Sequence, residues 1–415
     1  MEMKKIKIKF TDFWPSFNPY NNFILDKFLD KYDVEISDEP DYVIYSVFGW
    51  EFLKYDCIRI FFTGENVRPD FNFCDYAIGF DYLEYGDRYL RYPLGYVYTE
   101  REEIESALFD RCTNNDAVKK DKFCNFIYSN GNTKTGRDEI FELLSKYKNV
   151  DSGGRHRNNV GYKVNSKLDW IKSYKFTIAF ENSSTNGYTT EKIIEAFAAH
   201  TVPIYLGDPL IEREFNGKAF INCHRYKNFE EVVEKVIEID KDENLYLEML
   251  KEPVFLNKDI LNLYRKRIRD FFVNIFEQDL EECFRRTRYG FELNREREIK
   301  KNSILNNLLI MLIRTDFQKR INESIIAIYG AGDLGTILYD LLPKEIIVEA
   351  FIDKYSGLSE YKGVPIIRLE ELEKVKGNKI VVTAVSDMEM IVNEIRKRNA
   401  NIDIVSLEEW LKNFD

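Results

Sequence analysis

The feature that most constrains the fold is an alternation of short β-rich runs with helical patterns, which occurs in three successive stretches of the 415 residues. In the first stretch, about residues 5–101, a helical pattern covers 22–32. The β-rich runs of this stretch are 6–10, 42–47, 57–63 and 76–80. Because strands that alternate with helices form parallel sheets covered by helices, we predict an α/β fold.

The second stretch repeats this rhythm after a polar segment, residues 112–122, that is rich in Asn, Asp and Lys. It opens with a predicted strand at 123–129 and a helix at 137–147. Its further predicted elements are strands at 176–180, 202–206 and 219–222 and helices at 190–199 and 229–239. Two such stretches in tandem predict two lobes with a cleft between them.

The third stretch starts at residue 325, after a long helical segment from 259 to 322. The charged run at 294–302 is typical of a solvated helix or linker. The segment also has an apolar face at helical spacing, formed by Ile304, Leu305, Leu308, Leu309 and Leu312. This face suits packing against the protein's own lobes or a partner chain, so we expect any homo-oligomer to form through 294–322 or the C-terminal module. The predicted domains are 1–115, 116–262 and 323–415, with a helical linker at 263–322.

Composition narrows the class of protein. The 71 acidic and 60 basic side chains give a net charge of -11, which disfavours nucleic acid as a partner. Six cysteines occur without a Cys-x-x-Cys pair, so we expect reduced core residues rather than disulfides or a metal site. The chain start lacks the apolar run of a signal peptide, and the apolar run at 304–313 is about half of the ~20 residues of a membrane span. We therefore expect a soluble, cytoplasmic protein without a membrane span.

The densest chemical segment is 176–207, where an apolar strand ends in a polar loop and a helix follows. Thr189 or Thr190 is placed to cap this helix, and Glu191 and Lys192 lie in its first turn. A helix N-terminus binds phosphate, Lys192 adds a positive charge, and Glu191 can accept hydrogen bonds from sugar hydroxyls. These features indicate a sugar-nucleotide pocket. Alternatively, Glu191 only complements the helix dipole and Lys192 is a surface residue.

Three motifs of this segment resemble the signature of the α-1,3/4-fucosyltransferase family, particularly its bacterial members. They are Phe180-Glu-Asn-Ser183, Tyr188-Thr-Thr-Glu-Lys192 and Val202-Pro-Ile-Tyr-Leu-Gly207. The resemblance extends in order and spacing to Phe62-Thr-Gly-Glu-Asn66, Asp75-Tyr-Ala-Ile-Gly-Phe80, Arg88-Tyr-Leu-Arg91, Gly161-Tyr-Lys163 and the stretch from Pro209 to Phe220. It covers about residues 5–264 and implies a GT-B fold of two facing Rossmann-like lobes. The acceptor would bind mainly to the first lobe and GDP-fucose mainly to the second.

The resemblance also implies an inverting single displacement, in which β-linked GDP-fucose gives an α-fucoside. Such chemistry needs a base for the acceptor hydroxyl, and Glu65 matches the glutamate of the family's Thr-Gly-Glu-Asn motif. Glu65 follows the predicted strand at 57–63, so we expect it at a carboxyl end in the cleft. The alternative is a surface glutamate that pairs with Arg68.

Donor recognition is implied for five residues. Arg137 and Lys192 would stabilise the departing diphosphate, because Arg grips phosphate oxygens in pairs and Lys supplies a charge. Asn182, Tyr188 and Glu191 would shape the nucleotide and fucose pocket, although Tyr188 also fits a packed aromatic. If Arg137 does not have this role, Arg155 and Arg157 are the alternatives.

The family resemblance points to N-acetylglucosamine in a lactosamine-type chain as acceptor, fucosylated on its 3-hydroxyl or on its 4-hydroxyl to give a Lewis-type glycan. It implies no obligatory metal or other cofactor beyond the donor substrate GDP-fucose. His156, His200 and His224 are too scattered in the sequence to suggest a set of metal ligands.

The third stretch carries the dinucleotide-binding pattern Gly330-Ala-Gly-Asp-Leu-Gly335, with Gly332 as its second glycine and Asp353 at the end of the next strand. This pattern supports a different function, an NAD-dependent oxidoreductase or a nucleotide sensor. However, only ~90 residues follow residue 325, fewer than a dinucleotide fold with its own substrate domain needs. The alternative is that the glycines only make a tight turn.

Overall fold

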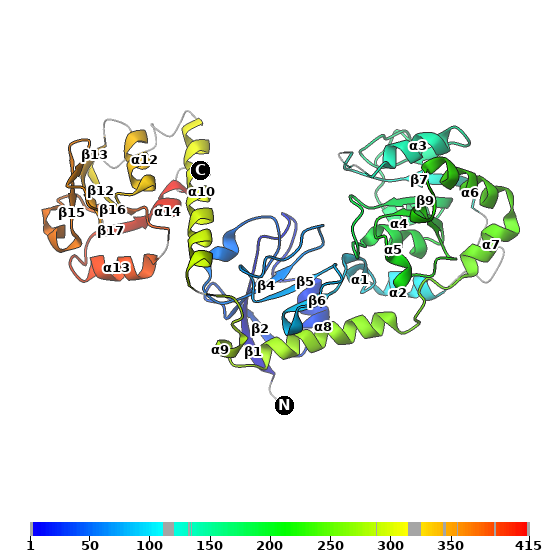
Figure 1. Cartoon of the computed structure of the whole chain (residues 1–415), viewed down its shortest axis with the longest axis horizontal. Coiled ribbons are helices and arrows are strands. Elements are labelled where there is room, and N and C mark those ends of the chain that lie inside the picture. The colour runs from blue at the N-terminus through cyan, green and yellow to red at the C-terminus, as the bar shows by residue number, and fades with distance from the viewer. Residues whose placement is uncertain are drawn as a thin grey trace. The chain divides into compact units, whose positions relative to one another are not determined.

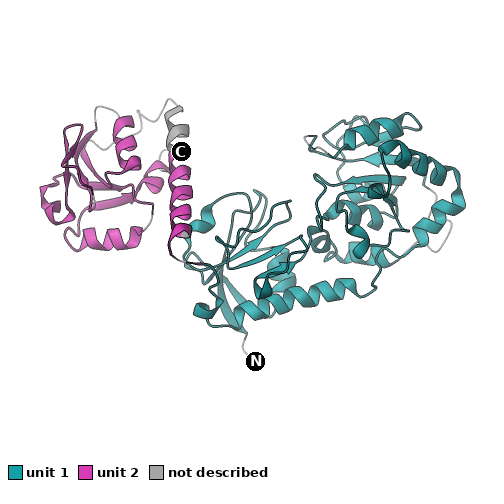
Figure 2. Ribbon diagram, viewed as in Figure 1, with its two compact units in different colours: residues 1–286 teal, residues 287–415 magenta. Residues whose placement is uncertain are grey.

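The computed structural model describes residues 3–412 apart from 111–119, 132, 134, 288, 314–324, 343–345, 355 and 386, and for Glu292 and residues 307–313 it describes the backbone alone. The chain forms two compact units, residues 1–286 and 287–415 (Figures 1 and 2). Most of the polar segment at 112–122 and the predicted boundaries near 115 and 322 lie outside the described residues. The domain boundaries therefore stay predictions.

A parallel six-stranded sheet forms the first lobe of unit 1 and has the order β2-β1-β3-β4-β5-β6. Its strands are β1 (Lys4–Thr11), β2 (Tyr32–Ile36), β3 (Tyr42–Tyr45), β4 (Ile58–Phe62), β5 (Tyr76–Gly79) and β6 (Tyr89–Arg91). The short helical elements among and after them are η2 (Glu51–Lys54), η3 (Gly86–Arg88), α1 (Leu94–Tyr98) and α2 (Glu102–Phe109). All four strands predicted for this stretch are confirmed, as β1, β3, β4 and β5.

The helix predicted at 22–32 is wrong in extent. Only one π-helical turn, η1 (Ile24–Phe28), forms before the chain enters β2. The Asn22 side chain starts this turn by accepting hydrogen bonds from two of its backbone N–H groups, at 3.1 and 3.2 Å. Tyr32, the last residue of the predicted helix, already pairs with β1 as the first residue of β2.

The second lobe contains a parallel five-stranded sheet with the order β11-β10-β9-β7-β8. Its strands are β7 (Lys122–Phe126), β8 (Val150–Ser152), β9 (Tyr174–Phe180), β10 (Val202–Leu206) and β11 (Ile221–Asn222). Its helices are α3 (Arg137–Ser145), α4 (Lys167–Ile171), α5 (Glu191–Ala198), α6 (Phe229–Lys241) and α7 (Glu243–Lys251), with the short η5 (Ile211–Arg213) and η6 (Cys223–Arg225). The strands and helices predicted here are confirmed with shifted boundaries, and α3 and α6 lie side by side (Figure 1).

A long helix, α8 (Ile260–Phe276), follows the second lobe and packs against the core of the first. The Phe276 ring, for example, lies 4.6 Å from the Tyr42 ring, centroid to centroid. The short helix α9 (Leu280–Cys283) comes next. The segment predicted as a linker at 263–322 thus begins within the core of unit 1.

Unit 2 is a third α/β domain with the sheet order β14-β15-β13-β12-β16-β17, parallel except for the β14–β15 pair. Its strands are β12 (Ile325–Tyr329), β13 (Ile347–Ile352), β14 (Glu360–Tyr361), β15 (Val364–Ile367), β16 (Lys379–Val382) and β17 (Asp403–Ser406). Its helices are α10 (Phe291–Ile313), α12 (Asp333–Leu341), η7 (Leu369–Lys374), α13 (Met388–Arg396) and α14 (Leu407–Lys412). The prediction of a small Rossmann-like C-terminal domain agrees with this alternation.

Helix α10 belongs to unit 2 rather than forming a free linker. Ile304 is buried in the core of that unit, and Leu305 packs against it. The side chains of Leu308, Leu309 and Leu312 lie outside the described ones. At residues 304 and 305 the predicted apolar face therefore packs against the core of unit 2. Contact of this face with a partner chain stays a prediction.

None of the helices in the described part of the chain is long and apolar enough to cross a bilayer. Five cysteines are free thiols, and four of them are buried: Cys74, Cys124, Cys223 and Cys283. Cys57 is half-buried, and Cys112 lies outside the described residues. The four buried cysteines thus have the core positions predicted for them.

Candidate active site

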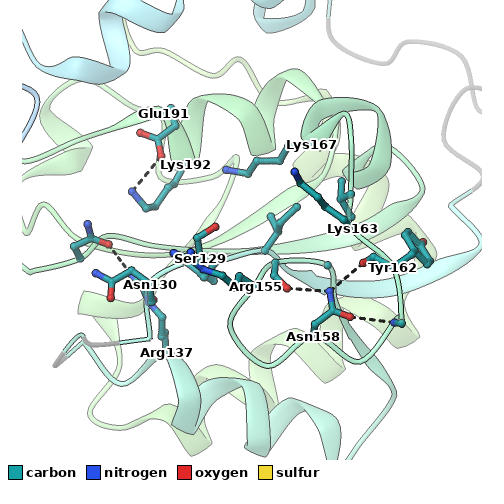
Figure 3. Close-up of a pocket in the computed structure, with 17 residues that line it drawn as sticks. Ser129, Asn130, Arg137, Arg155, Asn158, Tyr162, Lys163, Lys167, Glu191 and Lys192 are labelled. Carbon is teal, nitrogen blue, oxygen red and sulfur yellow. Dashed lines mark hydrogen bonds and ion pairs between the residues drawn. The ribbon is translucent and has the colours of Figure 1, made fainter. Parts of the chain in front are cut away.

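The carboxyl ends of three neighbouring strands, β8, β7 and β9, surround a pocket of about 1120 Å³ in the second lobe (Figure 3). β7 lies between the other two strands. The chain passes from β7 to β8 on one side and later enters β9 on the other, so the loops after β7 and β9 diverge. Open α/β sheets bind ligands at such switch points.

The pocket lining comes from several of these loops and from the helix starts that follow them. It includes residues 127–130 after β7, Arg137 at the start of α3, residues between 153 and 164 after β8, Lys167 at the start of α4, Asn182 after β9, and Glu191 and Lys192 at the start of α5. The basic lining residues are Arg137, Arg155, Lys163, Lys167 and Lys192. Glu191 is the one acidic residue in this lining. A pocket of this charge suits a polyphosphate ester with hydroxyl groups.

The start of α5 is organised around Glu181, whose side chain is fully buried. The Glu181 carboxylate accepts hydrogen bonds from the Thr190 backbone N–H at 2.7 Å and from the Thr190 hydroxyl at 2.6 Å. Thr190 is the N-cap residue as predicted, but its side chain makes no cap hydrogen bond. The reason is that Glu181 reaches the helix start and engages both polar groups of Thr190.

Lys192 makes an ion pair with Glu181, at 3.1 Å, and a second with Glu191, at 3.3 Å. Burial lowers the pKa of the Lys192 ammonium, but the two carboxylates outweigh burial and raise its pKa above the ordinary value. Lys192 therefore stays charged at the edge of the pocket. The reading of Lys192 as an ordinary surface residue is wrong, because only 13% of its side chain is exposed.

Replacing Glu181 with Gln is expected to destabilise the fold by about 3 kcal/mol, because the buried Lys192 charge loses the nearer and fully buried one of its two counter-charges. The matched control is Glu212→Gln, since Glu212 pairs with the exposed Arg225 and a surface ion pair contributes only ~1 kcal/mol or less. Urea unfolding of both variants measures the difference. Equal, small losses of stability in the two variants would contradict the organising role of Glu181.

Arg137 is buried at the base of the pocket, and its guanidinium lies 3.9 Å from the centroid of the Tyr128 ring. Backbone carbonyl groups hold the guanidinium in place. Its Nη2 donates to the Phe180 and Glu181 carbonyl oxygens, at 3.2 and 3.0 Å. The same nitrogen donates to Asn182 Oδ1 at 3.1 Å. Arg137 makes no ion pair within the described residues, so its charge is available to an anion.

The two alternative arginines differ in position. Arg155 lines the pocket, as Figure 3 shows. Arg157 does not line it and makes ion pairs with Asp138 at 3.2 Å and Glu142 at 2.7 Å. Of these two, only Arg155 can act on a ligand in the pocket from the position it has here.

Asn182 lines the pocket, whereas Tyr188 does not. Tyr188 is buried, and its ring packs edge-to-face against Phe80 with 5.2 Å between centroids. Close to it, Gly187 has φ +82°, and a Cβ there would lie 2.4 Å from the Phe80 carbonyl oxygen. Tyr188 thus has the position of a packed aromatic at the junction of the two lobes.

Glu65 follows β4, and its side chain is exposed and outside the pocket lining. The next residue, Asn66, donates hydrogen bonds to the hydroxyls of Ser183 and Thr185, at 2.5 and 2.8 Å. These bonds join the loop of Glu65 to the loop that follows β9. Arg68 pairs with Asp81, so the predicted alternative of an Arg68–Glu65 pair is wrong.

The glycine pattern of unit 2 makes a tight turn. Gly330 has φ +107°, and a Cβ on Gly335 would lie 2.0 Å from the Gly330 carbonyl oxygen, whereas a Cβ on Gly332 would meet open space. Asp353 accepts hydrogen bonds from the Ala331 and Ser356 N–H groups, at 2.8 and 2.7 Å. Asp353 thus supports the turn itself, in addition to any ligand role predicted for it.

Among the described residues, no group of three or more His, Cys, Asp or Glu side chains is arranged to hold a metal ion. The sequence reasoning missed Glu181, Lys163 and Lys167. Glu181 and Lys163 stand inside the motifs Phe180-Glu-Asn-Ser183 and Gly161-Tyr-Lys163, which were the available signals. Lys167 stands in no motif of this kind, so the sequence around it gave no signal. In the structure it forms an ion pair with Glu195, at 2.5 Å.

Comparison with known proteins gives two family matches. A sequence model of the "Alpha-(1,3)-fucosyltransferase FucT N-terminal domain" matches residues 8–98, and one of "Glycosyltransferase family 10 (fucosyltransferase) C-term" matches residues 117–252. Both matches lie within unit 1. Neither they nor the similar proteins support the alternative of an NAD-dependent oxidoreductase.

Individual relatives agree with the family matches. The Helicobacter pylori "Alpha-(1,3)-fucosyltransferase FucT" is 34% identical over 318 residues, which are 66% of each chain. The human "4-galactosyl-N-acetylglucosaminide 3-alpha-L-fucosyltransferase 9" is 33% identical over 136 residues, 32% of this chain and 37% of that protein. The chain therefore spans somewhat less than two thirds of the first of these relatives and about a third of the second.

A crystal structure of an α1,3-fucosyltransferase with GDP-fucose is 31% identical, with a TM-score of 0.58 over 67% of this chain and 92% of that one. This similarity confirms the predicted GT-B fold of two Rossmann-like lobes in unit 1. Together with the family matches, it confirms the resemblance on which the donor-site residues were predicted. The chain belongs to glycosyltransferase family 10, the fucosyltransferases.

Proposed function

We propose that this protein transfers L-fucose from GDP-fucose to a hydroxyl group of an oligosaccharide. The observation that carries the proposal is the basic pocket at the switch point of the second sheet, which Arg137 and Lys192 line. The similar α1,3-fucosyltransferase structure with GDP-fucose supports the same donor. The basic side chains supply the positive charge for the diphosphate, so the proposal includes no obligatory metal or other cofactor.

In this proposal the diphosphate lies against Arg137 and Lys192, while Asn182 and Glu191 contact the sugar and ribose hydroxyls. Arg137 has no ion-pair partner among the described residues, so its charge is available to the diphosphate. Its Nη groups donate to backbone carbonyl oxygens, and they would exchange these partners for phosphate oxygens when the donor binds. Lys192 stays charged through Glu181, which keeps a cation beside the leaving group. Arg155 is the further candidate for a phosphate contact, and Tyr188 has a packing role beside the pocket.

The proposed step is a single displacement with inversion. The acceptor hydroxyl oxygen attacks the anomeric carbon of fucose, and the bond from that carbon to the β-phosphate oxygen breaks. The Glu65 carboxylate takes the hydroxyl proton, and GDP leaves with the bond's electron pair. Support for Glu65 comes from its exposed carboxylate and from Asn66, which joins its loop to the loop after β9.

For the acceptor we propose N-acetylglucosamine in a lactosamine-type chain, fucosylated on the 3-hydroxyl or else on the 4-hydroxyl. The names of the Helicobacter pylori and human relatives favour the 3-hydroxyl. The experiment is incubation with GDP-fucose and a panel of type 1 and type 2 lactosamine acceptors, followed by linkage analysis of the products. Fucose on an oxygen of galactose only would contradict this acceptor assignment.

We propose that unit 2 has no part in the chemistry and serves stability, assembly or regulation. A chain ending at Arg286, the last residue of unit 1, is expected to keep turnover within about threefold of the full chain, because compact units fold independently. This end point removes α10 as a whole together with the rest of unit 2, to whose core it belongs. Steady-state assays and light scattering compare activity and oligomeric state. A folded, GDP-binding chain 1–286 without turnover would overturn this assignment.

A further inference from the structure

His156 joins the loop after β8 to the start of α3, and no part of the proposed chemistry uses it. Its Nε2 lies 2.7 Å from Asp138 Oδ1. Because an ionised carboxylate only accepts hydrogen bonds, the imidazole carries a proton on Nε2 and donates it to Asp138. The contact is largely shielded from water, since 22% of the His156 side chain is exposed. The two residues are called the His156–Asp138 bridge below.

Each end of the bridge follows directly after an arginine of the pocket lining. Arg155 precedes His156 and Arg137 precedes Asp138, and both arginines line the donor pocket (Figure 3). Like charges repel, so the fold has to hold two guanidinium groups together at one site. The bridge ties together the two backbone segments that carry these groups.

The loop after β7 also holds His156. The His156 N–H donates to the Tyr128 carbonyl oxygen at 2.9 Å, and the Ser152 hydroxyl donates to the His156 carbonyl oxygen at 3.0 Å. A Cβ on Gly131 would lie 2.4 Å from His156 Nδ1, so the imidazole packs directly on this loop. Since the Tyr128 ring lies against the Arg137 guanidinium, His156 is fixed relative to the support of Arg137.

The two arginines differ in what holds their side chains. The Arg137 guanidinium donates to backbone carbonyl groups at the carboxyl ends of β7 and β9. The Arg155 side chain is exposed, and it has no hydrogen-bond or ion-pair partner among the described residues. The position of Arg155 at the pocket therefore depends on its backbone, which the neighbouring His156 anchors.

The arginine on the other side of His156 is held away from the pocket. Arg157 Nε lies 3.2 Å from the same Asp138 Oδ1, and Arg157 Nη2 lies 2.7 Å from Glu142 Oε1. Both carboxylates belong to α3, and Arg157 is not part of the pocket lining. The loop thus pairs one of its arginines with α3 and leaves Arg155 available to a ligand.

We infer that His156 is a positioning residue for donor binding: through the His156–Asp138 bridge it holds Arg155 near Arg137, so that both guanidinium groups contact one diphosphate. This inference rests on the proposed function. A guanidinium fork binds phosphate oxygens in pairs, and a diphosphate offers oxygens to two such forks. Because Arg155 has no other partner among the described residues, its contact with phosphate breaks no ion pair there.

The test is titration of the full chain with GDP and with guanosine. His156→Ala is expected to raise the Kd for GDP about tenfold, because Arg155 loses its fixed position and a charge-assisted hydrogen bond is lost. The Kd for guanosine, which has no phosphate, should stay unchanged. His156→Gln should restore most of the affinity for GDP, since its amide nitrogen can take the place of Nε2 and donate to Asp138.

The matched control is Arg157→Ala, which removes the other partner of Asp138 and leaves the bridge intact. It is expected to bind GDP with the wild-type Kd.

A double-mutant cycle connects the effect to Arg155. Arg155→Ala alone is expected to raise the Kd for GDP by about tenfold as well. In the Arg155→Ala background, His156→Ala should add less than about a twofold change, because the guanidinium that it positions is absent.

The outcomes separate the inference from the proposed function. An unchanged affinity for GDP in His156→Ala or in Arg155→Ala, while the wild-type protein binds GDP, would overturn the inference alone. Equal losses for GDP and guanosine, a His156→Gln variant no better than His156→Ala, or effects of His156→Ala and Arg155→Ala that multiply would also overturn it, because His156 would then act through the fold. A wild-type protein that neither binds GDP nor transfers fucose would instead count against the proposed function.

Discussion

Replacing Glu65 with Gln is expected to lower the turnover number about 100-fold or more, while the affinity for GDP stays at the wild-type value. Gln keeps the size and the hydrogen-bonding capacity of the side chain but cannot take the proton of the acceptor hydroxyl. Since Glu65 is exposed and lies outside the pocket lining, its loss should disturb neither folding nor the donor site. Steady-state kinetics and calorimetric titration with GDP measure the two quantities.

The matched control for Glu65 is Glu84→Gln, which neutralises another exposed glutamate of the first lobe. It is expected to retain wild-type turnover. If Glu65→Gln also retained near wild-type turnover, a different group would have to accept the proton.

Replacing Lys192 with Ala is expected to lower kcat/KM roughly 10²–10³-fold, because the departing diphosphate loses a charge worth ~3–4 kcal/mol in the transition state. The same change leaves Glu181 buried without its cation, so it should also destabilise the fold. The double variant Lys192→Ala with Glu181→Gln separates the two effects. It should recover much of the stability and none of the activity.

Arg157→Ala is the control for the Lys192 experiment, since Arg157 is a neighbouring cation outside the pocket. Its kcat/KM is expected to be near the wild-type value, whereas Arg137→Ala should fail in transfer like Lys192→Ala. Recovery of activity in the Lys192–Glu181 double variant would show that Lys192 acts through the fold alone.

The sequence predicted most strands correctly because they are short apolar runs bounded by polar loops, as at β4 and β9. It failed at 22–32, where the helical turn stops at Phe28 and Tyr32 already belongs to a strand. Residues of β2 pair with β1 across the sheet, and nothing in the local pattern indicates that pairing. The first-lobe packing of α8 also depends on contacts more than 200 residues apart, such as Phe276 with Tyr42.

The candidate site was predictable where one segment carries the chemistry. Asn182, Glu191 and Lys192 line one pocket because a single strand-to-helix loop presents them. Glu181 escaped prediction, because its burial and its position beneath Lys192 appear only when the loop is folded. Lys163 comes from the loop after another strand, so only the sheet order β9-β7-β8 brings it to the same pocket.

The most direct test of fucose transfer is proton NMR of a reaction containing the full chain, GDP-fucose and N-acetyllactosamine. We expect loss of the β-linked GDP-fucose signal, an equal gain of an α-fucoside signal, and release of one GDP for each fucose transferred. A folded protein that binds GDP but leaves both substrates unchanged, or a product with β-linked fucose, would contradict it.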